Sequence, residues 1–278
     1  MINRDDKLIN DFGAEWKKFN QKKISLSSNK KIFNKYFSIF PWELINKKSI
    51  CLDVGGGSGR WSFFIADRVK KIYLIEPSSQ AIEVAKKNLS NFSNIEYHNN
   101  DANQMSIKNE SIDFCYCLGV LHHIPNIYKA LIGINKKLKK NAPFLIYIYY
   151  AFDNRPAWFR ILWKISDFFR IIISSLPFFL KGPICDILAL TIYLPISRIS
   201  KILKLFGFNI KNFPLSFYAN QKFYVLRNDA LDRFGTKIEQ RLTKKQITDL
   251  LQKTGFNKIS FSNEEPFWCA ICFKEKSL

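Results

Sequence analysis

A short apolar run followed by closely spaced glycines constrains the fold of this chain more than any other feature. Residues 49–52 are short and mostly apolar, and they lead into the run Leu52-Asp53-Val54-Gly55-Gly56-Gly57-Ser58-Gly59. Residues 61–66 have the composition of a helix start. Glycines let the backbone approach a ligand without a Cβ in the way. The first turn of a helix presents unpaired N–H groups and a partial positive charge. The sequence therefore predicts a strand, a turn and a helix that together hold a nucleotide-like ligand.

Three further predicted strands follow in order, at 71–75, 94–102 and 112–118. An acid at the end of the first of them, roughly 20 positions past the glycines, can accept hydrogen bonds from both hydroxyls of a ribose. Strands that alternate with helices predict a parallel sheet with a pocket at the carboxyl ends of the strands. The residues that close these segments are Glu76, Asp101-Ala102 and Leu118-Gly119.

These four motifs in series resemble the class I S-adenosylmethionine-dependent methyltransferases. The resemblance covers about residues 48–150 and returns near the C-terminus. Gly55, Gly57 and Gly59 are spaced as GxGxG, rather than as the GxGxxG of dehydrogenases. The resemblance implies an α/β fold with a doubly wound, mostly parallel, Rossmann-like sheet of seven strands and a reversed edge strand.

The resemblance also implies S-adenosylmethionine as the cofactor and a role for each matching residue. Asp53 would orient the glycine loop, Glu76 would bind the ribose diol, and Asp101 would accept from the adenine amino group. Trp16 follows a Phe-Gly pair and would fold over the cofactor as part of a lid, although the spacing of Phe12, Trp16 and Phe19 also suits a helix packed on the sheet edge. The expected cofactor residues are Trp16, Asp53, Gly55, Gly57, Gly59, Glu76, Asp101, Ala102, Leu118 and Gly119.

Two adjacent histidines after the fourth predicted strand are the candidate catalytic residues. The unperturbed pKa of an imidazole suits a general base, so His122 or His123 could take a proton from the acceptor; the alternative is a structural turn. No metal site is predicted, because adjacent histidines do not easily chelate one ion and no carboxylate partner is obvious. The Asn/Asp-Pro-Pro-Tyr motif of enzymes that methylate planar amino nitrogens is absent, which argues against adenine in DNA and glutamine in proteins as acceptors.

The chain divides by composition into four parts: a helical lid at 1–48, the cofactor core at 49–150, an insert at 151–225 and a C-terminal helix with strands at 226–278. The insert is dense in aromatic and aliphatic residues. Three interpretations stay open: a cap over the site, a membrane-surface element within 155–205, and a homodimer contact. Its charge-free runs at 171–180 and 187–197 are shorter than the ~20 residues that a spanning helix needs, so a transmembrane segment is not predicted.

A second polar cluster lies where the insert rejoins the core. An acceptor with hydroxyls or a carboxylate could be held there, and the alternative is a salt-bridged helix surface. The candidate substrate residues are Tyr218, Arg227, Asp229, Arg233 and Arg241.

The formal net charge of +20 needs an interpretation of its own. The lysines are spread along the chain and accompany many Asn and Ile residues, so compositional bias is favoured over a nucleic-acid partner, and no RNA-binding module is recognisable. The six cysteines form no paired framework, and the first residues lack an apolar leader. A cytoplasmic protein is expected, with peripheral contact at the inner membrane surface if the insert binds lipid.

These patterns together predict a methyltransferase that acts on an oxygen or nitrogen atom of a small molecule. Two alternatives remain: a methyltransferase for a lipid or quinone at the membrane surface, and a non-catalytic subunit that binds S-adenosylmethionine and scaffolds a partner. An RNA methyltransferase is supported by charge alone.

Overall fold

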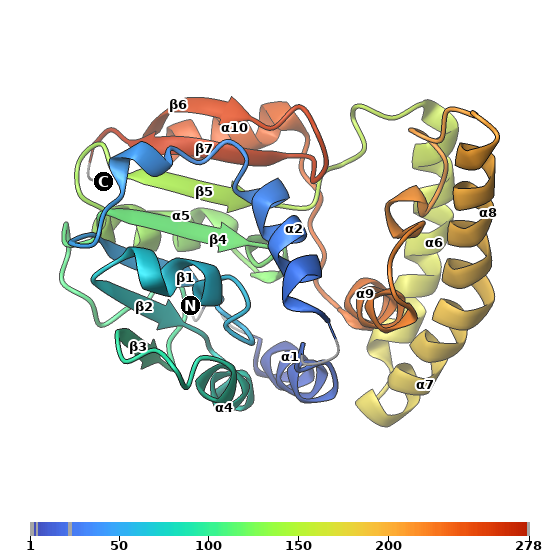
Figure 1. Cartoon of the computed structure of the whole chain (residues 1–278), viewed down its shortest axis with the longest axis horizontal. Coiled ribbons are helices and arrows are strands. Elements are labelled where there is room, and N and C mark those ends of the chain that lie inside the picture. Colours follow the sequence, from blue (N-terminus) through green and yellow to red (C-terminus); the bar gives the residue numbers. More distant parts are fainter. Residues whose placement is uncertain (1–2, 4, 22–23, 277–278) are drawn as a thin grey trace. The chain divides into compact units, whose positions relative to one another are not determined.

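The computed structural model describes residues 3, 5–21 and 24–276. They form two compact units, which are described separately (Figure 1). The core unit contains Met1–Ala151 and Ile238–Leu278, and the insert unit contains Phe152–Lys237. The insert therefore continues to Lys237 rather than ending at residue 225.

The core unit is built on one seven-stranded sheet with the order β3-β2-β1-β4-β5-β7-β6 (Figure 1). Strands β1 to β5 run parallel, and β7 runs antiparallel to both β5 and β6. The predicted mostly parallel sheet is confirmed, but the reversed strand lies between β5 and the edge strand β6 rather than at the edge. The strands are β1 (Ile50–Val54), β2 (Lys71–Ile75), β3 (Ile95–His98), β4 (Phe114–Leu118), β5 (Pro143–Tyr147), β6 (Phe256–Phe261) and β7 (Cys269–Lys274).

Helices of the core unit begin where the sequence supplies side-chain caps. Ser78 accepts from the backbone N–H of Ala81, and Thr243 forms a reciprocal capping box with Gln246. The helix after the glycine loop is short, because α3 passes into a 3-10 turn at Ala66. The helices are α1 (Asp6–Lys18), α2 (Leu26–Tyr36), α3 (Ser62–Ile65), α4 (Ser79–Asn88), α5 (Ile127–Lys137) and α10 (Lys244–Lys253).

Both faces of the sheet are buried, as a parallel sheet requires. Leu52 and Val54 of β1 pack in one cluster with residues of α5 and α10, whereas Cys51 packs on the opposite face with Phe33 of α2 and Trp61. All six cysteines are buried free thiols. This packing fixes the positions of the strand ends, where the candidate site lies.

The insert unit consists of four helices: α6 (Ala157–Ser175), α7 (Phe178–Leu188), α8 (Leu194–Leu205) and α9 (Phe223–Gly235). Helix α9 packs against α6 and α7, and it buries Leu226, Ala230 and Leu231. This packing explains why residues 226–237 belong to the insert and not to the C-terminal part of the core.

A π-helical turn at Ala189–Tyr193 joins α7 to α8 without a break. The resulting helix, Phe178–Leu205, has 28 residues and is long and apolar enough to cross a membrane by length and composition. The charge-free run at 187–197, which is too short to span a membrane, lies within this longer helix. Lys181 and Asp186 interrupt the apolar sequence, but both have partners inside the insert: Lys181 donates to the carbonyl of Gly235, and Asp186 pairs with Arg227.

Candidate functional site

The carboxyl ends of β1, β2 and β4 lie side by side in the core unit. Asp53 of β1 stands opposite Leu74 of β2 and Tyr116 of β4. Immediately beyond β1, the N–H groups of Gly55 and Gly56 both donate to the carbonyl of Ile75, at 2.8 and 3.1 Å. These bonds hold the glycine loop against the end of β2.

Two glycines of this loop lie where a side chain would collide with its neighbours. A Cβ on Gly55 would come within 2.4 Å of Val120, and a Cβ on Gly57 would come within 2.9 Å of the Trp16 indole. Both residues also have positive φ angles, which L side chains rarely adopt. The four predicted glycines share this backbone conformation: Gly55, Gly57, Gly59 and Gly119.

Glu76 comes directly after β2, and its carboxylate reaches back to the loop. One oxygen accepts from the N–H of Gly57 and the other from the N–H of Ser78, both at 3.0 Å. A carboxylate offers about four lone-pair positions, so these two amides leave positions for the hydroxyls of a ribose. The donor and acceptor chemistry of Glu76 thus fits the ribose of S-adenosylmethionine.

Burial raises the pKa of both acids at this edge. The pKa of Glu76 rises to about 7, because desolvation outweighs the hydrogen bonds from Ser78 and Gly57. The pKa of Asp53 rises to about 6, again mainly through desolvation, which outweighs the hydrogen bonds from Ser62 and Tyr116. A ligand that donates hydrogen bonds to these carboxylates would stabilise their charged form.

A buried hydroxyl network that the sequence did not reveal supports Asp53. Ser62 donates to the Asp53 carboxylate at 2.7 Å, and its oxygen lies 2.9 Å from the phenolic oxygen of Tyr116. Tyr116 is fully buried in β4. No local pattern links these three residues, because they come together only through pairing of β1 with β4 and packing of α3.

Helix α1 covers the glycine loop, as the lid prediction expects. The Trp16 indole lies against Gly57, and Gly13 lies so close to Ser78 that a Cβ would come within 2.5 Å of its hydroxyl. The side chain of Asn3 exchanges two hydrogen bonds with the backbone of Asn126. The proposed contact of Trp16 with cofactor stays a prediction, whereas its position beside the glycine loop is observed.

His122 and His123 are buried in the 3-10 turn Leu121–His123 after β4. The Nδ1 atom of His122 accepts from the backbone N–H of Tyr149 at 3.3 Å, and the two rings stack with centroids 3.7 Å apart. Burial, together with the charges of His123 and Arg241, lowers the pKa of His122 well below its usual value. The Nδ1 lone pair of His122 accepts the hydrogen bond from Tyr149, so the proton of the neutral ring is on Nε2. The ring then has no free basic nitrogen to take a proton from an acceptor, which is a poor arrangement for a general base.

His123 has a different environment. Its Nδ1 atom lies 2.7 Å from the carbonyl of Ile238, and its ring lies 5.1 Å from that of Phe12 in α1. These contacts tie the turn after β4 to the lid helix and to the segment that leads into α10. They suit the structural interpretation of this turn, and a catalytic role for His123 remains a prediction.

The other predicted cofactor residues lie on the same side of the sheet. Asp101 and Ala102 come after β3, whose last carbonyl, at His98, accepts from the N–H of Glu76. Leu118 ends β4, and the N–H of Gly119 donates to the carbonyl of Tyr147 at 3.1 Å. A Cβ on Gly119 would meet nothing within 4 Å, so open space adjoins this residue.

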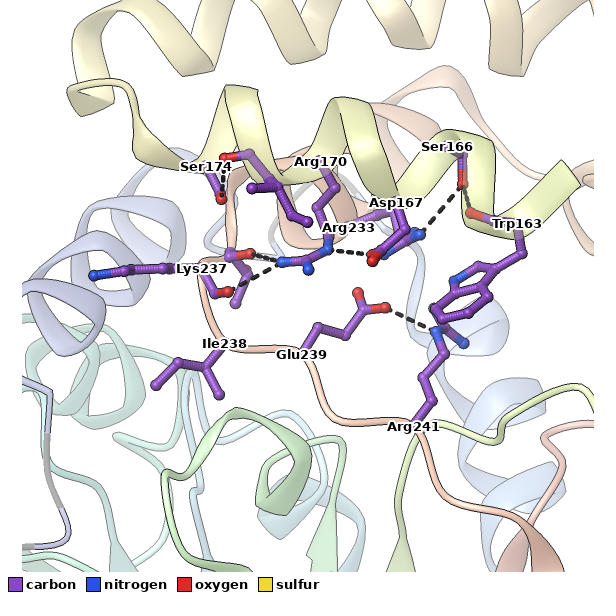
Figure 2. Close-up of polar contacts among 12 residues, drawn as sticks. Trp163, Ser166, Asp167, Arg170, Ser174, Arg233, Lys237, Ile238, Glu239 and Arg241 are labelled. Atoms are coloured by element: carbon purple, nitrogen blue, oxygen red, sulfur yellow. Dashed lines mark hydrogen bonds and ion pairs between the residues drawn. The ribbon is translucent and has the colours of Figure 1, made fainter. Parts of the chain in front are cut away.

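The predicted substrate residues belong to both units of the chain. Arg227 makes a bidentate ion pair with Asp186 of α7, at 2.9 and 2.6 Å, and Arg233 contacts Asp167 of α6 at 3.5 Å. Arg241 belongs to the core unit, where it donates to Glu239 at 2.7 Å. Figure 2 shows the pairs of Arg233 and Arg241. These ion pairs suit the alternative of a salt-bridged helix surface, and a substrate-binding role for these arginines stays a prediction. The remaining two candidates, Tyr218 and Asp229, lie in the insert unit.

Comparison with known proteins supports the assignment made from the strand ends. The profile of a family described as a methyltransferase domain matches residues 52–146. This segment holds the glycine loop, Glu76, Asp101 and the turn after β4. The chain contains a class I methyltransferase domain.

The curated relatives match part of the chain. A protein of Dictyostelium discoideum named as a methyltransferase is 27% identical over 139 residues, which is 48% of this chain and 50% of that protein. The uncharacterized methyltransferase YcgJ of Bacillus subtilis is 24% identical over 102 residues, which is 36% of this chain and 40% of that protein. The chain thus spans about half or less of the length of the curated relatives it matches.

Solved structures share the fold over nearly the whole chain. An S-adenosylmethionine-dependent methyltransferase of Thermotoga maritima aligns with 95% of this chain and 100% of its own, at 14% identity and a TM-score of 0.51. A Haloferax volcanii methyltransferase solved with the activator Trm112 aligns with 95% of this chain and 98% of its own, at 10% identity and a TM-score of 0.53. S-adenosylmethionine is the cofactor of this domain class, and the donor set at Glu76 and the glycine loop fits it.

Proposed function

We propose that this protein transfers a methyl group from S-adenosylmethionine to an oxygen or nitrogen atom of a small molecule. The main support for the proposal is the position of the Glu76 carboxylate. It is buried at the end of β2 and accepts a hydrogen bond from the N–H of Gly57 in the glycine loop. When bound, the cofactor supplies a methyl group already activated on a sulfonium. The chain then has to hold both reactants in line and to exclude water.

The residues of the core unit are suited to that work. The two backbone amides on Glu76 fix its orientation before a ligand arrives, so binding costs little reorganisation. Ser62 fixes the carboxylate of Asp53 in the same way. Trp16 shields the glycine loop on the side that α1 covers. These contacts support positioning and desolvation as the main contributions of the chain to methyl transfer.

A small acceptor with an oxygen or nitrogen nucleophile is supported by the segment immediately after β4. Leu118-Gly119-Val120 stands where enzymes for planar amino nitrogens carry an Asn/Asp-Pro-Pro-Tyr motif. The open space beside Gly119 gives an acceptor a place at the strand ends. An acceptor with a hydroxyl or amine of ordinary reactivity needs orientation more than it needs a strong base.

Calorimetry with Glu76→Ala tests cofactor binding. The variant removes the carboxylate that would accept from the ribose, so we expect binding of S-adenosylmethionine and S-adenosylhomocysteine to weaken by at least tenfold, given about 1.5–3 kcal/mol for each bond to a charged group. Glu83→Ala is the matched control, because Glu83 lies exposed on α4. Unchanged affinity in Glu76→Ala, or equal loss in both variants, would contradict the assignment.

Turnover needs a separate assay. Purified protein, S-adenosylmethionine and pools of small alcohols, phenols, carboxylates and amines would be followed by mass spectrometry for an added methyl group and for S-adenosylhomocysteine. We expect product from one chemical class of acceptor. Cofactor binding without product from any pool would favour the non-catalytic scaffold instead.

A further inference from the structure

The helices of the insert unit have an unusual distribution of polarity. The residues that α6 buries are Arg170 and Ser174, and those that α8 buries are Ser197 and Ser200. In a helix of a water-soluble domain the apolar stripe normally faces the interior and the polar side faces water. Here the buried positions of both helices are polar.

Internal hydrogen bonds satisfy these buried polar groups. Arg170 donates to Asp167 at 2.6 Å and to the carbonyls of Thr236 and Lys237 at 3.0 Å (Figure 2). Ser200 donates to the carbonyl of Ser197 at 2.7 Å. The buried polar groups are therefore stabilised by hydrogen bonds within the insert unit. The apolar side chains of α6 and α8 can face outward without leaving these groups unsatisfied.

The opposite side of α6 is apolar and exposed. Ile165 is 55% exposed and Phe168 is 62% exposed. These two residues and their neighbours recur at helical spacing, so they form one stripe along the helix. Its exposed members include Trp158, Ile161, Leu162, Ile165, Phe168 and Phe169.

The helix Phe178–Leu205 repeats this arrangement. Only 28% of its most apolar 18-residue window is buried within the chain. Ile187, Leu190, Ile199 and Ile202 are among its exposed side chains. Large apolar side chains that gather on an exposed face mark a surface that interacts with a protein, a ligand or a membrane.

The charges of the exposed side chains of the insert unit indicate what this apolar surface contacts. Within the insert unit, which is described throughout, the exposed ionisable side chains are the cations Arg160, Lys164, Lys201, Lys204, Lys211, Lys222 and Lys237 and the single anion Asp153. Helical geometry places Arg160 and Lys164 at the border of the α6 stripe. Lysine and arginine stems can lie along apolar surface while their charged ends reach a polar boundary.

We propose that the insert unit docks on an anionic membrane surface through the apolar sides of α6 and α8, with the bordering cations at the lipid headgroups. Interfacial helices of this kind carry aromatic and aliphatic residues on one side and Lys or Arg on the other. A second copy of the chain fits less well, because a symmetric contact would bring two cation-bordered faces together. The inference goes beyond the proposed methyl transfer and does not depend on it.

Vesicle flotation of the purified full chain tests this proposal. We expect the protein to float with vesicles of phosphatidylcholine mixed with phosphatidylglycerol, and to float less at high salt or with phosphatidylcholine alone. Protein that stays at the bottom with both vesicle types would overturn the proposal.

Two pairs of double variants locate the contact. Ile165→Asp with Phe168→Asp removes apolar contact on α6, and we expect it to abolish flotation. The matched control is Leu26→Asp with Leu44→Asp, which makes the same change at two exposed leucines of the core unit. Equal loss in the control would overturn the assignment of the surface.

Lys201→Glu with Lys204→Glu tests the electrostatic part. With about fivefold in partitioning for each cation near an anionic surface, we expect at least ~25-fold weaker binding. Lys47→Glu with Lys48→Glu changes the charge equally on exposed positions of the core unit and should have a smaller effect. These surface lysines also keep the test valid if the α6 variant fails to fold.

Two further measurements distinguish surface attachment from dimerisation and from a helix that spans the membrane. A dimer of the lipid-free protein that Ile165→Asp with Phe168→Asp dissociates, without flotation of the wild type, would assign the surface to a second copy and overturn the proposal. Protein in cell membranes that resists extraction by alkaline carbonate would indicate a spanning helix at Phe178–Leu205 and overturn surface attachment. Calorimetric binding of S-adenosylhomocysteine serves as the folding control for every variant.

Discussion

Replacing Glu76 with Gln should change how the stability of this protein depends on pH. The pKa of Glu76 rises from an ordinary value of 4.5 to about 7 in the folded chain, because burial disfavours the charged form. The folded state therefore holds the proton more tightly than the unfolded state. Between these two values stability falls as the pH rises, since unfolding then releases a proton.

The size of the effect comes from the shift. Each unit of pKa difference corresponds to about 1.4 kcal/mol, so Glu76 contributes a loss of about 3 kcal/mol over the whole range from pH 4.5 to above 7. About 2 kcal/mol of this falls between pH 5.5 and 8, where the protein can be handled. Glu76→Gln removes the titration and keeps the shape of the side chain.

Urea unfolding of wild type and Glu76→Gln at several pH values would measure the difference. The difference in unfolding free energy between the two should change by about 2 kcal/mol from pH 5.5 to pH 8, in the direction that favours the variant at high pH. Glu83→Gln, on the exposed surface of α4, should show no such change. A constant difference between wild type and Glu76→Gln across this range would refute the argument from burial.

The site and the insert support three other predictions. Gly57→Ala should destabilise the protein by more than the ~1–2 kcal/mol cost of a positive φ angle, because its Cβ would also meet Trp16; thermal unfolding measures this. Trp16→Ala should speed release of S-adenosylhomocysteine by about fivefold in stopped-flow experiments, if an aromatic contact of about 1 kcal/mol is lost. Asp167→Asn should destabilise the protein by about 1–3 kcal/mol in urea unfolding at pH 7, because buried Arg170 loses a charged acceptor.

Each of these predictions has an internal comparison. Gly207 has a φ angle of 81° and open space around its Cβ, so Gly207→Ala should show the backbone cost without the clash; equal losses would remove the role of Trp16 in the first prediction. Trp158→Ala, at an exposed position of α6, should leave ligand release unchanged.

The pH dependence of the Asp167→Asn effect provides its control. Burial tends to raise the pKa of Asp167, but its hydrogen bond and ion pairs with Arg170 and Arg233 outweigh this and hold the pKa below its usual value. The carboxylate therefore adds stability above its usual pKa and loses that contribution as the pH falls through the lowered value. The loss in Asp167→Asn should shrink on acidification, and a loss independent of pH would contradict the ion-pair explanation.

The sequence alone determined the cofactor half of the core unit. Strand ends, glycine turns and helix caps depend on the conformational preferences of neighbouring residues. A positive φ angle at Gly57 or a Ser at the N-cap of α4 therefore needs no distant partner. For the same reason the position of Glu76 could be predicted, since it depends only on where β2 ends. The mostly parallel sheet could be predicted from the alternation of strands and helices.

Only the tertiary structure decided how the polar groups of distant segments pair. Arg227 and Arg233 pair with acids on α7 and α6 that lie dozens of residues away, and no local pattern predicts these partners. The hydroxyl network around Asp53 and the outward-facing apolar side of α6 also depend on contacts between segments that are distant in the sequence. A helical pattern shows which side chains share a face, but not which face is turned inward, because that depends on whether neighbouring helices can satisfy the polar groups they bury.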